Sequence, residues 1–269
     1  MISCGLDLGS SLVKGALVED GKKLLATATH PVRGNLAEGG REVLEQMAGE
    51  ENLLPGEIDY LCTTGFGRYM FPERQLQVSD FTSSAKGALF LYPATRHVLD
   101  VGAQSSRAMA VSLTGKVVKF KMNEKCAAGA GRFVERCSKY LQVPLEEMAT
   151  RALAAEKPRL ISSVCAVLAE TEIINNVAEE IPLPDILMGV YLSLAQRAFG
   201  LMRYVGIDPE VTLVGGLVHS PAMVRAVQET THLKVNAEPL GHHAAAIGAA
   251  LLGYQRSLKL ARERAGTGS

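Results

Sequence analysis

Residues 5–14 read GLDLGSSLVK, and this stretch decides the fold. Its first half belongs to an apolar run, residues 2–8, that predicts a strand, and Gly9 with the two serines after it predicts a tight turn. Residues 12–19 then predict a second strand that returns beside the first. The same order of strand, glycine turn and strand recurs around DVGAQSS, residues 100–106, so the chain contains an internal repeat of architecture.

The rest of each half fits one plan of three strands, a helix, a strand and a helix. In the first half we expect a strand near 23–29, a helix over 38–49, a strand over 58–63 and a helix over 80–91 that Asp80 caps. In the second half we expect strands at 97–101, 107–113, 116–122, 210–215 and 233–236, and helices at 220–230 and 243–263. A mostly helical insertion occupies about 126–206. We therefore predict an α/β protein of two lobes around a cleft, residues 1–95 with 240–269 and residues 96–239.

The composition excludes several classes of function. Of 269 residues, 47% are hydrophobic and 21% charged, which is typical of a globular protein and not of a disordered one. The 28 basic and 28 acidic residues cancel without forming a basic stripe, so we expect no nucleic-acid partner. The N-terminus lacks the pattern of a signal peptide, and no window has the roughly 20 apolar residues of a membrane helix. We expect a cytoplasmic protein that does not enter the membrane.

The first glycine turn has the chemistry of a phosphate site. The backbone at Gly9 can approach phosphate oxygens closely, and Ser10 and Ser11 add hydroxyl donors. Asp7, at the end of its strand, can hold hydrated Mg²⁺, and Lys14 can reach a phosphate. An ordinary β-hairpin has the same sequence pattern, so this turn alone leaves both interpretations open.

Two further turns carry the same type of signal. The second is built from Asp100, Gly102, Ala103 and Gln104, and the third is Gly215-Gly216, which follows a strand and can lie flat against an adenine or ribose. The chain has no GxxxxGK[ST] phosphate loop, which excludes a Walker-type NTPase. In their order, the three turns resemble the two phosphate motifs and the adenosine motif of the actin-like ATPase superfamily. That resemblance implies an actin/hexokinase/Hsp70-like fold with ATP and Mg²⁺ in the cleft.

Two of the five cysteines stand where helices are expected to begin. Cys126 lies in MNEKCAAGAGRF, residues 122–133, and Cys165 lies in SSVCAVLAETEIIN, residues 162–175. The partial positive charge of a helix N-terminus favours the thiolate form, which is the form that binds metal. Burial of a free thiol in a core is the simpler alternative. Two thiolates are also too few for a 4Fe–4S cluster, so a cluster here needs a second subunit.

These two motifs and the first glycine turn strongly resemble the ATP-dependent activators of 2-hydroxyacyl-CoA dehydratases and the ATPase subunits of benzoyl-CoA reductase. The resemblance implies that Cys126 and Cys165 bind one 4Fe–4S cluster shared by two protomers. It implies a CoA-thioester reductase or dehydratase as partner and a ferredoxin-like electron donor. It also implies that Asp7, Asp100 and Gln104 serve ATP hydrolysis, which would gate electron transfer through closure of the two lobes.

The second phosphate turn separates the members of this family. Activators usually carry an acidic residue after the glutamine, whereas this chain has Ser105 there. In this respect the chain is most similar to the smaller, D-type subunit of benzoyl-CoA reductase, which pairs with a non-identical paralogue. A homodimeric dehydratase activator remains an alternative. So do a small-molecule kinase of the same fold and an ATP-gated scaffold without iron.

Overall fold

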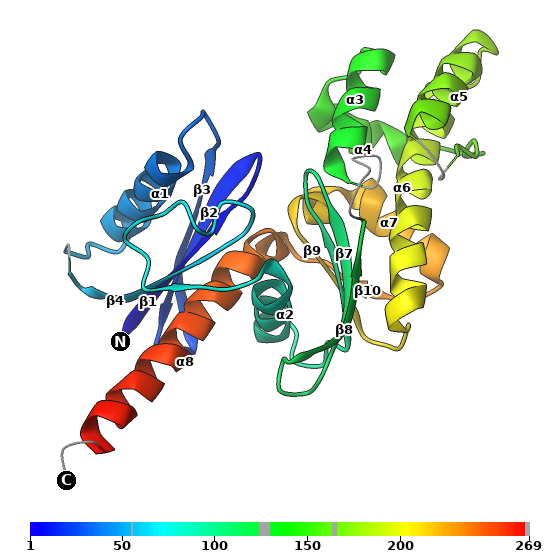
Figure 1. Ribbon diagram of the computed structural model, residues 1–269. Coiled ribbons are helices and arrows are strands. Elements are labelled where there is room, and N and C mark those ends of the chain that lie inside the picture. The colour runs from blue at the N-terminus through cyan, green and yellow to red at the C-terminus, as the bar shows by residue number, and fades with distance from the viewer. Residues whose placement is uncertain (55, 124–129, 163–165, 267–269) are drawn as a thin grey trace. The chain divides into compact units, whose positions relative to one another are not determined.

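The computed structural model describes residues 1–54, 56–123, 130–162 and 166–266 (Figure 1). The chain forms two compact units. Unit 1 comprises Met1–Pro93, Thr114–Lys116 and His243–Ser269, and unit 2 comprises Ala94–Leu113 and Val117–His242. Unit 1 is therefore discontinuous in sequence, and unit 2 lies between its two main segments along the chain.

Unit 1 is built on a five-stranded sheet with the strand order β3-β2-β1-β4-β5. Its strands are β1 (Ile2–Leu8), β2 (Leu12–Glu19), β3 (Lys23–Pro31), β4 (Ile58–Thr64) and β5 (Leu76–Gln77). The first three strands are antiparallel neighbours, whereas β4 runs parallel to β1 and β5 runs parallel to β4. Its helices are α1 (Leu36–Glu50), α2 (Asp80–Leu91) and α8 (Ala244–Gly266). The short strand β5 was not expected from the sequence.

The helices of unit 1 begin at polar caps. Asn35 caps α1, because its side chain accepts hydrogen bonds from the amides of Ala37 and Glu38. The expectation that Asp80 caps α2 was wrong, since the side chain of Ser79 accepts from the amide of Thr82 instead. Asp80 lies inside the first turn, where its carboxylate interacts favourably with the helix dipole.

Two glycines allow α2 and α8 to pack closely within unit 1. A Cβ atom at Gly87 would collide with the backbone of Ala244, and one at Gly248 would collide with the backbone of Ser83. The two helices thus meet backbone to backbone along this contact. No flexible side chain lies between them there that could move aside to admit a larger residue.

Unit 2 repeats the sheet of unit 1 with the order β10-β9-β6-β7-β8. Its strands are β6 (His97–Val101), β7 (Ser106–Val111), β8 (Val117–Met122), β9 (Val211–Val214) and β10 (Val235–Asn236). Its α-helices are α3 (Gly131–Leu141), α4 (Leu145–Ala152), α5 (Ala166–Ala178), α6 (Leu183–Val205) and α7 (Pro221–Thr231). Two short 3₁₀ helices, η2 (Gly216–His219) and η3 (Pro239–His243), follow β9 and β10. Strand β7 ends at Val111, earlier than the predicted residue 113.

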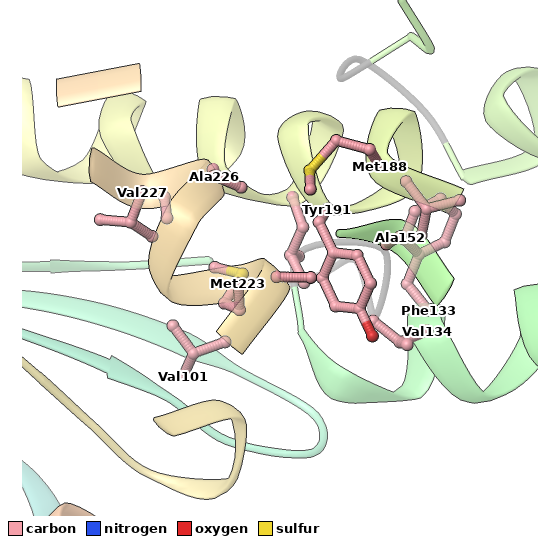
Figure 2. Packing of buried hydrophobic residues seen from close by; sticks show 14 of the residues in the cluster. Val101, Phe133, Val134, Ala152, Met188, Tyr191, Met223, Ala226 and Val227 are labelled. Carbon is pink, nitrogen blue, oxygen red and sulfur yellow. The ribbon is translucent and has the colours of Figure 1, made fainter. Parts of the chain in front are cut away.

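The core of unit 2 is centred on Tyr191 of α6 (Figure 2). Its ring is 2% exposed and lies among buried side chains from α3, α6 and α7, including Phe133, Met188 and Met223. Truncation of a buried aromatic side chain of this size typically costs about 3–5 kcal/mol. This core therefore joins α3 and α6 of the helical insertion to α7.

The two sheets correspond strand by strand, with β6 to β10 taking the places of β1 to β5. In each unit an antiparallel three-stranded meander is extended by parallel strands on the side of its first strand. This duplication is the actin/hexokinase-like arrangement that the sequence predicted. None of the helices in the described ranges is long and apolar enough to cross a membrane.

Candidate functional site

In unit 1, the predicted first phosphate turn joins β1 to β2. Asp7 of β1 lies opposite Lys14 of β2 in the sheet register, and the Lys14 Nζ atom is 2.8 Å from Asp7 Oδ2. The two side chains are only 11% and 13% exposed, so the carboxylate is held in a mostly dehydrated place with its charge compensated. The amide of Gly9 donates to the carbonyl of Leu12 at 3.1 Å, which closes the turn.

In unit 2, the predicted second phosphate turn joins β6 to β7 in the same way. Asp100 lies opposite Arg107 in the register, with Arg107 Nη1 3.2 Å from Asp100 Oδ2. The amide of Gly102 donates to the carbonyl of Ser105 at 3.0 Å, while the side chain of Gln104 is exposed. Arg107 was not among the predicted site residues. Its place follows from the hairpin register, which puts it where Lys14 lies in unit 1.

Each carboxylate also rests against a glycine of the neighbouring parallel strand. Gly65 follows β4 with φ +86°, and Gly215 follows β9 with φ +89°. A Cβ atom at Gly65 would collide with Asp7 Oδ1, and one at Gly215 would lie 2.6 Å from Asp100 Oδ1. Glycine is required at both places, because an L side chain is disfavoured at this φ and has no room beside the carboxylate.

The loop after β4 lies against Asp7, and the sequence analysis did not single it out. In unit 1 the amide of Arg68 donates to the carbonyl of Gly65 at 3.4 Å, and in unit 2 the amide of Val218 donates to that of Gly215 at 3.3 Å. The loop is thus the unit 1 counterpart of the predicted adenosine motif. The signal was present in TTGFGR, residues 63–68, where a glycine directly follows a buried strand.

The third predicted turn has an open side. Gly215 is buried and its amide donates to the carbonyl of Gly241 at 3.1 Å, which ties η2 to η3. Gly216 is exposed, and a Cβ atom there would meet nothing within 4 Å. A flat group can therefore approach the backbone at Gly216, which is consistent with the predicted contact to adenosine.

Helix α3 begins directly on the second phosphate turn. The amide of Gly131 donates to the carbonyl of Gly102 at 2.9 Å, and the amide of Arg132 donates to that of Ala103 at 2.8 Å. The N-cap residue Ala130 has no side chain that can accept from the first amides of a helix. Turn carbonyls thus take the place of a capping side chain, and the helix and the turn share backbone hydrogen bonds.

The predicted cluster ligands Cys126 and Cys165 lie outside the described residues, so their predicted role stays a prediction. The other three cysteines are buried in the cores of their units. Burial raises the pKa of Cys62 and of Cys137 to about 12, and it raises that of Cys4 even further. These thiols are therefore neutral at physiological pH, which makes them poor metal ligands. Among the residues described, no group of three or more His, Cys, Asp or Glu side chains is placed to bind a metal ion.

Each unit therefore offers a carboxylate with a cation beside it and a glycine turn after it. Carboxylate oxygens suit Mg²⁺, and turn amides with nearby hydroxyl groups suit phosphate oxygens. The roles of Asp7, Asp100 and Gln104 in ATP hydrolysis stay predictions, as do those of the glycine and serine residues in binding.

Known proteins resemble this chain over nearly its whole length. The chain matches the BadF/BadG/BcrA/BcrD ATPase family over residues 4–253. It is 36% identical to the D-type subunit of benzoyl-CoA reductase from Thauera aromatica, covering 97% of this chain and 96% of that protein. The solved structure of the activator of 2-hydroxyisocaproyl-CoA dehydratase from Clostridium difficile, with bound ADPNP, superposes with a TM-score of 0.91. Its identity is 30%, and 98% of each chain is covered.

The fold extends to kinases. A glucokinase of the ROK family from Streptomyces griseus, solved with glucose and AMPPNP, superposes with a TM-score of 0.58 at 12% identity. The alignment covers 95% of this chain and all of the kinase chain. At this level of identity the likeness shows the shared fold alone.

Proposed function

The chain belongs to the BadF/BadG/BcrA/BcrD ATPase family, and from this premise we propose that it is an ATP-dependent activating subunit of a CoA-thioester reductase or dehydratase. The function would be to bind ATP, to share a 4Fe–4S cluster with a second subunit and to deliver low-potential electrons. The solved relative with bound ADPNP supports the nucleotide. Both relatives named above support a CoA-thioester enzyme as partner.

One observation carries the nucleotide part of the proposal. Asp7 and Asp100 occupy equivalent register positions in the two sheets, each beside a basic residue and ahead of a glycine turn. In the proposed complex Asp7 and Asp100 would hold Mg²⁺, and the turns at residues 9–11 and 102–106 would contact phosphates. Gly215 and Gly216 would contact the adenosine.

The proposal for the cluster rests on the donor set of this chain. The three described cysteines are buried and neutral, which leaves Cys126 and Cys165 as the candidate thiolates. Two thiolates from each of two subunits complete the four that a 4Fe–4S cluster requires. When bound, the cluster would supply one-electron transfer, for which we propose a ferredoxin-like protein as donor.

For the identity of the second subunit, we propose a non-identical paralogue, as in a benzoyl-CoA reductase. The identity of 36% with the D-type subunit supports this choice, as does Ser105, which stands where activators usually carry an acid. A homodimeric activator of a 2-hydroxyacyl-CoA dehydratase is the second candidate. The TM-score of 0.91 with a dehydratase activator favours it.

Anaerobic purification from the native host tests the proposal. We expect iron and sulfide in the purified protein, MgATP hydrolysis, and a copurifying CoA-thioester enzyme with or without a paralogous chain. Replacement of Cys126 or of Cys165 by serine should remove the cluster, whereas Cys62→Ser, a change at a buried core thiol, should leave the iron content unchanged. A colourless protein that phosphorylates a small molecule would instead support a kinase. Full iron content in either cluster variant would contradict the assignment of the ligands.

A further inference from the structure

A polar link between Glu170 and Arg136 joins helices α5 and α3. Glu170 of α5 is 11% exposed, and its Oε1 atom lies 2.7 Å from Arg136 Nη2 of α3. Its Oε2 atom accepts from Arg136 Nη2 at 2.9 Å and from the hydroxyl of Tyr140 at 3.2 Å. A buried carboxylate depends strongly on such partners, since their removal leaves a charge that neither water nor protein compensates.

Beyond this link, α5 presents a largely unpacked face. Its residues Ala169 and Ile173 are buried in the core of unit 2, and Glu170 and Asn176 are buried as well, while other residues are exposed by half or more: Leu168, Ile174 and Val177. A helix held on one narrow side can shift as a unit more readily than one packed all round. Glu170 therefore adds a polar contact to the core packing by which Ala169 and Ile173 hold α5 beside α3.

The other end of α3 lies on the second phosphate turn. The amides of Gly131 and Arg132 donate to the carbonyls of Gly102 and Ala103, at 2.9 and 2.8 Å. Arg136 and Tyr140 lie on the same helix, one and two turns further along. A continuous set of hydrogen bonds and one rigid helix thus connects the turn, through Arg136, to Glu170.

We propose that Glu170 is a positioning residue that makes α5 respond to the nucleotide held at the second phosphate turn. The inference rests on the proposed function, because it requires ATP at that turn. Phosphate binding at Gly102 and Ala103 changes the position of the carbonyls that cap α3. The helix moves with its cap, and α5 follows because Glu170 holds it to Arg136. Nucleotide then affects α5 without contacting it.

Hydrogen exchange of the full-length protein, measured by mass spectrometry with and without saturating MgATP, tests this inference. In the wild type we expect MgATP to slow exchange about fivefold or more both in α3, residues 131–141, and in α5, residues 168–178. Glu170→Gln, which keeps the volume of the side chain and removes its charge, should keep the response of α3 and lose that of α5. Arg136→Gln should do the same from the other side of the link, and Arg136 is half exposed, so its replacement leaves the core packing in place.

Glu135→Gln is the matched control, because it makes the same chemical change on the same helix at an exposed ion pair with Arg132. It should respond like the wild type in both helices. In a double variant, Arg136→Gln with Glu170→Gln, the loss of the α5 response to MgATP should be no larger than in either single variant. A variant that only loosens the packing of α5 would raise its exchange rate without nucleotide. The ratio of the exchange rates with and without MgATP would not be abolished.

The outcomes separate the two proposals. A wild-type chain that shows no MgATP binding in calorimetry overturns the proposed function and this inference with it. A chain that binds MgATP but shows no response in α5, or whose Glu170→Gln variant keeps that response, overturns the inference alone. Loss of the α5 response in Glu135→Gln as well would also overturn it, because the effect would then not be specific to the link.

Discussion

Substitution of Gly65, which lies against the Asp7 carboxylate, offers the sharpest test of the proposed site. Gly65→Ala places a methyl group where it collides with Asp7 Oδ1, in a backbone with φ +86°. Gly34→Ala is a matched control, because Gly34 has φ +110° and a Cβ atom there would meet nothing within 4 Å. Both substitutions impose the same kind of backbone strain, but only the first displaces the carboxylate.

The expected magnitudes follow from these two contributions. Placing an L residue in the left-handed region costs about 1–2 kcal/mol, which applies to both variants. Overpacking at a tightly filled place costs about 1–3 kcal/mol more, and this applies to Gly65 alone. We therefore expect Gly65→Ala to be destabilised by about 2–5 kcal/mol and Gly34→Ala by about 1–2 kcal/mol.

A measurement of nucleotide affinity distinguishes an effect on the proposed site from a general loss of stability. If Asp7 positions Mg²⁺, its displacement should weaken MgATP binding by about tenfold or more in Gly65→Ala, which corresponds to about 1.4 kcal/mol. Isothermal titration calorimetry at a temperature where both variants are folded measures this, and Gly34→Ala should bind like the wild type. Equal affinities in the two variants would refute the reasoning that Gly65 holds the carboxylate in place for Mg²⁺.

Three further predictions concern charge and burial. Arg107→Met removes the cation beside Asp100, which is 8% exposed, and should destabilise the protein by about 3 kcal/mol in scanning calorimetry. Arg107→Lys keeps a positive charge and should restore most of the lost stability. Equal melting temperatures for the wild type and Arg107→Met would contradict this prediction. Burial raises the pKa of Cys62 and of Cys137 to about 12, so these thiols stay protonated at pH 8 and iodoacetamide should label neither until the protein unfolds. Rapid labelling of the folded protein, seen by peptide mass spectrometry, would contradict this prediction. In the unfolded chain the same thiols ionise from about pH 8.5, so folding stability should be unaffected below that pH and should fall as the pH rises towards 12. A variant with alanine at both positions should show a shallower alkaline decline in melting temperature, and an unchanged slope would refute this linkage.

The sequence predicted those parts of the structure that depend on local pattern. The repeat of strand, glycine turn and strand was visible because Asp7-Leu8-Gly9 and Asp100-Val101-Gly102 share both hydrophobic pattern and turn chemistry. The cap of α2 was misassigned because Ser79 and Asp80 are both good cap residues, and only the backbone conformation decides between them. Local preference therefore located the elements but not every boundary.

The site depended on pairing between segments, which pattern alone does not reveal. Arg107 is recognisable only once the register opposite Asp100 is known, and Gly65 only once β4 is seen to run parallel to β1. The link between Arg136 and Glu170 joins two helices separated by the whole of α4, and nothing in either helix predicts it. Tertiary contacts of this kind are set by packing, and packing has no short sequence signature.

The way α8 closes unit 1 has a consequence for synthesis on the ribosome. Strand β1 and helix α2 are translated first, but the helix that packs against them, with glycines at the contact, comes after all of unit 2. Unit 2 can therefore complete its core while part of unit 1 is still missing its final helix. We expect the nascent chain to expose the apolar side of β1 and α2 until residues 244–266 emerge, a period in which chaperone binding would protect it.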